Sequence, residues 1–314
     1  MKTLLAIGEA LIDFIPQNSG VPIKQVESFF PKVGGAPANV CGAFTKLGGT
    51  SQLITQLGND PFGNKIIDEF NHYGIGCEYI SKTDTANTSL AFVALQEDGN
   101  REFSFYRKPG ADMLLSPDAI QEEWFIDAFA LHFCSVSLGD FPMKDAHEKA
   151  IEYATKHGVL ISFDPNVRLA LWDDTSLLRQ RIREFLPKAD IVKISDEELE
   201  FITGKTVIEE ALPELFRGRV KMVIYTKGAQ GAESYTKYAR ASVPGKKVKA
   251  VETTGAGDAF IGSMLYQMAR DQVTADTVEH CSQIVMEEYL TKSNHYCAQS
   301  VLQKGAISSY PTTL

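Results

Sequence analysis

Cysteine is scarce in this sequence, and so are long apolar runs. The five cysteines among 314 residues are too widely spaced for a CxxC pair, so they give neither a zinc spacing nor a disulfide framework, and reduced thiols are expected. The short apolar run at the N-terminus is interrupted by Gly8-Glu9, which is not the pattern of a signal peptide. No apolar stretch approaches the ~20 residues that cross a membrane. We therefore expect a cytoplasmic protein with no membrane partner.

Positive charge is also in short supply. The formal net charge is −9 and no basic cluster offsets it, so nucleic acid is not an expected partner. A nucleotide is not excluded, because local amide dipoles, a few cations and Mg²⁺ can hold phosphate. Hydrophobic residues make up 44% of the chain and charged residues 23%, which is typical of a globular protein with room for a large α/β domain and a minor one.

Short apolar runs alternate with helical patterns along most of the chain. Buried strands are expected at residues 4–7, 51–57, 130–134, 159–163, 191–194 and 222–226. Helices are expected at residues 40–47, 61–70, 144–156 and 176–185. This alternation predicts an α/β fold with a mainly parallel central sheet and helices on both of its faces.

Two stretches break the alternation and predict a small β-sheet lid. Residues 10–33 hold short extended segments punctuated by proline and glycine, and residues 88–107 alternate polar and apolar around a turn at Asp98-Gly99-Asn100. The α/β domain would then comprise residues 1–9, 34–87 and 108–314.

The predicted lid is rich in phenylalanine. We place five of these residues on one apolar face: Phe14, Phe29, Phe92, Phe103 and Phe105. A lone small sheet is marginal in water, and a second copy of the lid would cover such a face. A homodimer formed through the lid is therefore expected.

The strongest motif is Thr254-Gly255-Ala256-Gly257-Asp258, which leads into an apolar helix. Two glycines let the backbone turn its N–H groups toward one point, and the helix N-terminus adds its dipole, so the segment predicts an anion site. A carboxylate inside such a site suits a base that deprotonates a hydroxyl beside a bound phosphate. A helix cap is the alternative for Asp258. The motif is not a dinucleotide fingerprint, because Phe260 stands where a third glycine would be. Nor does the chain hold a Walker A loop, because its one Gly-Lys-Thr, at residues 204–206, has Leu199 where the first glycine would be.

Four weaker motifs also follow or flank strands, and each has a structural alternative. The segment from Gly34-Gly35 to Asn39 suits close approach to sugar hydroxyls, or a helix cap with a tight turn. Residues 163–168 can line a polar pocket or make a plain turn. Acidic residues at 195–198 complement a helix dipole or organise Mg²⁺ through water. Residues 226–231 bring backbone close to a nucleotide or form a hairpin turn.

Together these motifs resemble the ribokinase-like (PfkB) carbohydrate kinases from residue 4 to Pro311. Within that family the chain is most similar to the fructokinases, in the strings at residues 8–14, 101–103, 111–115, 163–172 and 193–198. The resemblance implies an ATP-dependent kinase acting on a hexose, D-fructose above all, and forming fructose 6-phosphate. A 2-keto-3-deoxygluconate kinase and a ribokinase share nearly all the motifs. A sugar-responsive regulator built on a kinase fold is the non-catalytic alternative.

The resemblance also implies a role for each matching position. Asp258 would be the catalytic base, with the amides of Gly255, Ala256 and Gly257 as the anion hole. The sugar would contact Asp13, Gly34, Gly35, Asn39 and Arg168, with Arg107 reaching in from the lid. The ATP pocket would include Thr226, Gly228, Gly231, Gly255 and Gly257.

Two ions complete the implied site. Glu198 would organise Mg²⁺ through water, with Ser195 standing where the family commonly has Asn. A monovalent cation such as K⁺ would lie among Glu252, Thr254, Gly305 and Ser309. Glu252 stands where the family commonly has Asp, which leaves this cation site open.

Overall fold

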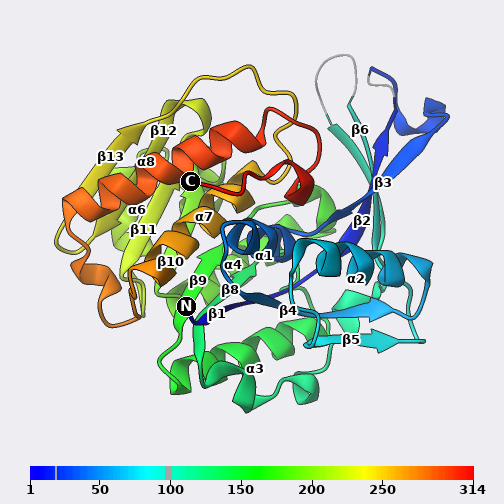
Figure 1. Ribbon diagram of the computed structural model, residues 1–314, viewed down its shortest axis with the longest axis horizontal. Helices are drawn as coiled ribbons and strands as arrows, with labels where there is room; N and C mark the ends of the chain where they lie inside the picture. Colours follow the sequence, from blue (N-terminus) through cyan, green and yellow to red (C-terminus); the bar gives the residue numbers. More distant parts are fainter. Residues whose placement is uncertain (18–19, 96–100) are drawn as a thin grey trace.

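The computed structural model describes residues 1–17, 20–95 and 101–314, and it contains one large sheet (Figure 1). Within these residues the sheet has nine strands in the order β13-β12-β11-β10-β9-β8-β1-β4-β5. The strands are β1 (Thr3–Ile7), β4 (Ser51–Gly58), β5 (Ile80–Thr83), β8 (Ala128–Cys134), β9 (Leu160–Asp164), β10 (Ile191–Ser195), β11 (Met222–Thr226), β12 (Gly231–Thr236) and β13 (Arg240–Pro244). All neighbours pair in parallel except the terminal β11-β12-β13 meander. The predicted mainly parallel sheet is confirmed.

Helices cover both faces of this sheet because its strand residues are apolar on both sides. One face packs against α1 (Ala36–Lys46), α2 (Pro61–Tyr73), α7 (Ala256–Arg270) and α8 (Gln283–Ser300), and the other against α3 (Pro142–Lys156), α4 (Thr175–Phe185), α5 (Asp196–Thr203) and α6 (Ile208–Leu215). Alternate residues of one strand enter different cores: Leu4 packs with α7 and α8, whereas Leu5 packs with α3 and α4. In the described ranges no helix is long and apolar enough to cross a membrane.

The predicted helix and strand boundaries agree with the structure to within a few residues, and α1 shows why the largest error arose. We expected this helix from Val40, but it begins at Ala36 with Gly35 as its N-cap. Pro37 lies in the first turn, where a missing N–H costs nothing, so the proline is part of the helix rather than a signal before it. Helix α2 begins where expected, and Asp60 is its N-cap, with a carboxylate that accepts from the amides of Phe62 and Gly63.

A second, four-stranded sheet projects from the first and corresponds to the lid (upper right of Figure 1). Its strands are β2 (Leu11–Pro16), β3 (Phe29–Gly34), β6 (Leu90–Leu95) and β7 (Arg101–Tyr106), in the order β3-β2-β6-β7. The β6–β7 pair is antiparallel, as predicted, whereas β2 and β6 run parallel. The turn expected at Asp98-Gly99-Asn100 lies outside the described residues.

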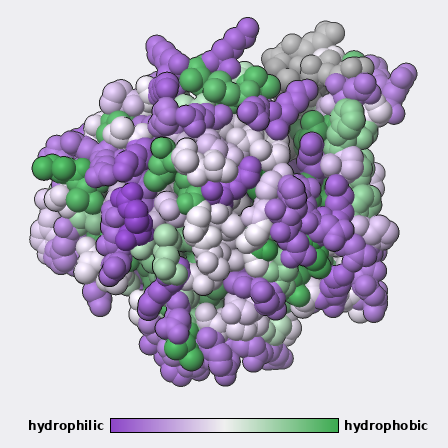
Figure 2. Space-filling view, in the orientation of Figure 1, coloured by the Kyte–Doolittle hydropathy of each residue, from purple (hydrophilic) through white to green (hydrophobic). Residues whose placement is uncertain are grey.

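The phenylalanines of the lid do not share one face. Phe14 stacks on Phe92 with ring centroids 4.6 Å apart, and Phe29 contacts both rings edge-on. Phe105 pairs with Ala91, the neighbour of Phe92, so the alternation of a strand places it on the opposite side. Our assignment of all five to one face is wrong, because it ignored the phase of the alternation. Figure 2 shows apolar side chains gathered over the lid.

Candidate active site

The predicted site residues collect along the carboxyl edge of the large sheet. The chain leaves β1 for β4 on one side and later returns to β8 on the other, so β1 and β8 form a switch point. Ligands of open parallel sheets bind in the crevice that such a switch leaves. Segments that follow β9, β10 and β11 at this edge begin at Asp164, Ser195 and Thr226.

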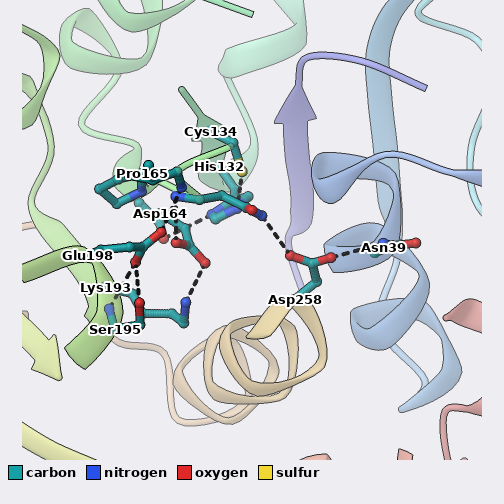
Figure 3. Close-up of polar contacts among 12 residues, drawn as sticks. Asn39, His132, Cys134, Asp164, Pro165, Lys193, Ser195, Glu198 and Asp258 are labelled. Atoms are coloured by element: carbon teal, nitrogen blue, oxygen red, sulfur yellow. Dashed lines mark hydrogen bonds and ion pairs between the residues drawn. The ribbon is translucent and has the colours of Figure 1, made fainter. Parts of the chain in front are cut away.

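Asp258 lies in the first turn of α7 and is held from two sides (Figure 3). The side-chain amide of Asn39 donates to its Oδ2 at 2.9 Å, and that of Asn166 donates to its Oδ1 at 3.2 Å. The carboxylate is buried, and residues from α1 and from the loop after β9 therefore meet at one group. Asp258 does not accept from the helix amides as its cap, and Gly255, with φ of 74°, occupies the N-cap position.

The environment of Asp258 suits a base that works near neutral pH. Burial, and to a smaller extent the charge of Asp164, raise its pKa, while the Asn39 hydrogen bond and the charges of Arg168 and Lys193 lower it. The net result is a pKa of about 7 in place of 3.8. A base is most effective when its pKa lies near the operating pH. Strong perturbation of this kind is typical of functional sites.

Lys193 and Asp164 form a buried ion pair beside this base. Their Nζ and Oδ2 atoms are 2.7 Å apart, and neither side chain exposes more than 6% of its surface. A Cβ built on Gly257 would lie 3.4 Å from Lys193 Nζ, so the cation sits directly beneath the first turn of α7. We did not predict Lys193 as a site residue. The available signal was a lysine inside an otherwise apolar strand, where an unpaired charge is rarely buried.

The loop after β9 is fixed by Glu198. Its Oε1 accepts from the Val167 amide at 2.7 Å, and its Oε2 accepts from the amide and hydroxyl of Ser195, both at 2.9 Å. Asn166 has φ of 47°, a strained value for a residue with a side chain, which aims its amide at Asp258. The two carboxylate oxygens of Glu198 therefore hold the loop after β9 against the end of β10. A role for Glu198 toward Mg²⁺ stays a prediction.

The lid brings Asp13 against the glycine pair. A Cβ on Gly34 would overlap Asp13 Oδ2, so this glycine makes room for the carboxylate. Burial raises the pKa of Asp13 to about 7, and the exposed Arg168 lowers the pKa of both Asp13 and Asp258. Gly35, with φ of 115°, could not carry a side chain, since a Cβ would meet the carbonyl of Glu9.

Asn39 offers an acceptor that nothing in the protein uses. Its amide nitrogen donates to Asp258, but its Oδ1 is buried without a hydrogen-bond partner among the residues described. A buried acceptor in this state costs free energy unless a ligand donor satisfies it. A hydroxyl of a ligand is one donor that could satisfy this atom, and the contact of Asn39 with the sugar stays a prediction. Arg107 forms an ion pair with Asp112, and its contact with the sugar stays a prediction.

The C-terminal segment supports the anion loop. The Tyr310 hydroxyl donates to the Gly255 carbonyl at 2.8 Å, and Glu252 Oε2 accepts from the Gly305 amide at 2.9 Å. Ser309 donates to the carbonyl of Ala306. The structure thus joins Glu252 to Gly305 and places Ser309 in the same C-terminal segment. Thr254, the fourth predicted cation residue, lies in the loop before α7.

The residues expected at the nucleotide lie in and after β11. Thr226 pairs with Ser195 of β10, next to the loop that Glu198 holds. Gly228 begins a 3₁₀ turn, and a Cβ on Gly231 would overlap the Val243 carbonyl across the β12–β13 pair. The hairpin turn is therefore present. The first-turn amides of α7 have no acceptor within their helix, and their role as phosphate ligands stays a prediction. The Ala256 amide donates to the carbonyl of Thr253 at 3.2 Å.

This arrangement can deprotonate a hydroxyl beside a bound phosphate, which is the chemistry of a phosphotransferase. The model of the pfkB family carbohydrate kinase matches residues 1–313, and the chain belongs to this family.

Relatives are similar over nearly the whole chain. The probable fructokinase-5 of Arabidopsis thaliana is 40% identical over 310 residues, 98% of this chain and 94% of that protein. The structure of a fructokinase from Xylella fastidiosa with bound ATP has a TM-score of 0.90 at 35% identity, covering 98% of this chain and 95% of that one. A fructokinase double mutant from Vibrio cholerae O395, in a fructose, ADP and potassium ion bound form, has a TM-score of 0.86 at 33% identity, covering 99% and 96%.

Proposed function

We propose that this protein is an ATP-dependent fructokinase that phosphorylates the 6-hydroxyl of D-fructose. One observation carries the chemistry: Asp258 is held by Asn39 and Asn166 at the N-terminus of α7, with its pKa raised to about 7. The fructokinase names of relatives at about 40% identity support the substrate.

Asp258 accepts the proton of the 6-hydroxyl as that oxygen forms a bond to the γ-phosphorus of ATP. The bond from phosphorus to the β–γ bridging oxygen breaks, and ADP leaves with the electron pair. Amides at the start of α7, with the charge of Lys193 beneath them, stabilise the transferring phosphoryl group. Mg²⁺ on the phosphates would neutralise further charge, with Glu198 next to its water shell.

The sugar is proposed to bind between the lid and the α/β domain. Asp13 and the glycine pair contact it from the lid side, while the unused Oδ1 of Asn39 accepts one of its hydroxyls. Two carboxylates, Asp13 and Asp258, suit a neutral polyol better than an acidic sugar, although the charge of Arg168 could balance the acid. Closure of the lid excludes water, which competes as an acceptor.

Assembly as a homodimer is proposed through the lid face of Phe14, Phe29 and Phe92. Part of this face already packs on α2 through Phe62, whose ring centroid is 5.7 Å from that of Phe14. Light scattering at micromolar concentration tests this directly, and a monomer would contradict it.

Steady-state kinetics at saturating Mg·ATP test the substrate. We expect kcat/KM for D-fructose to exceed that for ribose and for 2-keto-3-deoxygluconate by at least about tenfold, since a site built for particular hydroxyls rejects analogues that lack them. A preference for the acid would favour 2-keto-3-deoxygluconate kinase. Asp258→Asn is the control, and its turnover should fall by roughly 10²–10⁴. Fructose binding without ADP release by the unmodified protein would favour a regulator.

A further inference from the structure

Four chain crossings join the lid to the α/β domain, and a single buried hydrogen-bonded network touches all of them. The crossings lie at Glu9 before β2, Ala36 after β3, Ser89 before β6 and Arg107 after β7. At three of the four crossings a side chain takes part in the network, and these side chains belong to residues that are each less than 9% exposed: Glu9, Ser89 and Arg107. Residues distant in sequence thus meet where the two sheets separate.

The first half of the network ties β2 to the end of β3. Glu9 Oε1 accepts from the Ala36 amide at 3.1 Å, and Glu9 Oε2 accepts from the Ser137 hydroxyl at 3.1 Å. Ala36 opens helix α1, whose N-cap is Gly35 and so has no side chain to bond the first amides. Glu9 supplies that carboxylate from 27 residues away, where a negative charge also suits the helix dipole.

The second half ties β6 to the end of β7. Arg107 donates to Asp112 through Nε at 2.9 Å and also through Nη2, and the Ser89 hydroxyl donates to the same carboxylate. A Cβ on Gly110 would overlap the Ser89 hydroxyl, so there is no space for a side chain at this position. Asp112 itself belongs to the α/β domain, just after the lid ends.

Ser137 connects the two halves. Its hydroxyl donates to Glu9 and lies 3.3 Å from Arg107 Nη2, from which it can accept. Burial raises the pKa of Glu9, while the charge of Arg107 lowers it. The Arg107 guanidinium thus favours the ionised form of Glu9 in addition to its ion pair with Asp112. A buried ionic network is costly to break, because the partner left behind has lost its compensating charge. The network therefore fixes one arrangement of the four crossings.

We propose that this network is a clamp that holds the four lid crossings as one unit and thereby positions the sugar-binding residues of the lid. Two residues of the lid lie close to the clamp in sequence: Asp13 is four residues after Glu9, in β2, and Gly34 is two residues before Ala36, in β3. Asn39, outside the lid, lies in the helix that Glu9 caps. Glu9, Arg107 and Asp112 are positioning residues. The proposal rests on the proposed function only in taking the lid to cover the sugar.

Asp112→Asn tests the clamp, with Asp190→Asn as its matched control. Asp190 is also fully buried and paired with an arginine, Arg219, at 3.0 Å, but it precedes β10 at the opposite edge of the large sheet. Both variants should lower the melting temperature. For each variant, the amide exchange rates in lid strands β2, β3 and β6 are divided by those in β8 and β9. Compared with the unmodified protein, this ratio should rise at least about tenfold in Asp112→Asn and should not rise in Asp190→Asn.

Kinetics give the second readout. In Asp112→Asn we expect KM for fructose to rise at least about tenfold while KM for ATP changes less than about twofold, because the lid touches the sugar side alone. Equal lid exchange in the two variants would overturn the clamp. If the unmodified protein does not phosphorylate fructose, the proposed function is wrong. A selective increase of lid exchange in Asp112→Asn would support the clamp in that case as well.

Should Asp112→Asn not fold, Ser137→Ala provides the test, since it removes the bridging hydroxyl and leaves both ion-pair partners. The same selective increase in lid exchange is expected, at about threefold or more. Exchange that matches the unmodified protein would overturn the proposal.

Discussion

Lys193 Nζ lies 2.7 Å from Asp164 Oδ2, and the pair is buried beneath the turn that opens α7. The two charges of this ion pair act in opposite directions on the ionisation of Asp258. Asp164 raises the pKa of that carboxylate and Lys193 lowers it. Each half of the pair can therefore be removed with an effect of known sign.

We expect the pH profile of kcat/KM to shift in opposite directions in the two variants. A base must be ionised to act, so activity falls as pH drops through the pKa of Asp258 at about 7. Lys193→Met removes a charge that lowers this pKa, so the acid limb should move up by about one pH unit. Asp164→Asn removes a charge that raises it, so the limb should move down.

Other charged groups face Asp258 as well, and they stay in place in this test. Arg168 lowers the pKa of Asp258. Burial, followed by the charge of Asp258, raises the pKa of the neighbouring Tyr310. The double variant Lys193→Met/Asp164→Asn is the control, and its limb should return toward that of the unmodified enzyme. Shifts of equal sign in the two single variants would contradict the assignment of the base.

Asp258 should also destabilise the folded protein above neutral pH. Its pKa is raised from 3.8 to about 7 by folding, so the folded state holds the proton more tightly and stability decreases as pH rises from about 4 to 7. Removing the carboxylate avoids this cost, which is at most a few kcal/mol at ~1.4 kcal/mol per unit of pKa difference. Asp258→Asn should therefore melt higher at pH 8 and gain little at pH 4, as measured by calorimetry. A gain of equal size at both pH values would contradict the burial argument.

Gly34→Ala should weaken sugar binding by displacing Asp13. The new Cβ would overlap Asp13 Oδ2, so the carboxylate has to move. We expect KM for fructose to rise by about tenfold or more with a smaller change in kcat. A double-mutant cycle with Asp13→Ala isolates the cause, because Gly34→Ala should add little once the carboxylate is gone. Additive effects would mean that Gly34 acts independently of Asp13.

Potassium should raise activity if the predicted cation site exists. Glu252 accepts from the Gly305 amide, and a cation beside them would order the loop that carries Gly255. Rates in K⁺ should exceed those in a bulky organic cation at equal ionic strength by about threefold or more, and Glu252→Gln should reduce the difference. Identical rates in the two salts would mean that the site does not function.

The sequence was sufficient to predict the sheet, most of its strands and the segment around Asp258. Strand and helix periodicity depend on neighbouring residues, and so does the glycine pattern before Asp258. Contacts between segments are different. The bond from Asn166 to Asp258 and the ion pair from Lys193 to Asp164 depend on which strands are adjacent, and single-sequence patterns do not give strand order.

Arg107 and the lid phenylalanines show the same limit in another form. Nothing in the sequence indicates that Arg107, at the end of a lid strand, pairs with Asp112, because Asp112 is not distinguishable by pattern from any other acidic residue. For Phe105, a strand prediction without a register leaves the choice of face undetermined, and the pairing with Ala91 decides it.

The contact between Tyr310 and Gly255 has a consequence for biosynthesis. The base receives its partners from Asn39, near the start of the chain, and from Asn166 in the middle, while the loop before it is braced by a residue close to the last position described. A nascent chain on the ribosome therefore lacks this brace until Tyr310 has emerged, well after Gly255 and the helix that carries Asp258 have been synthesised. Chains that stop between these two points would hold Gly255, the N-cap of the helix that carries Asp258, without this brace, and we expect them to lack activity.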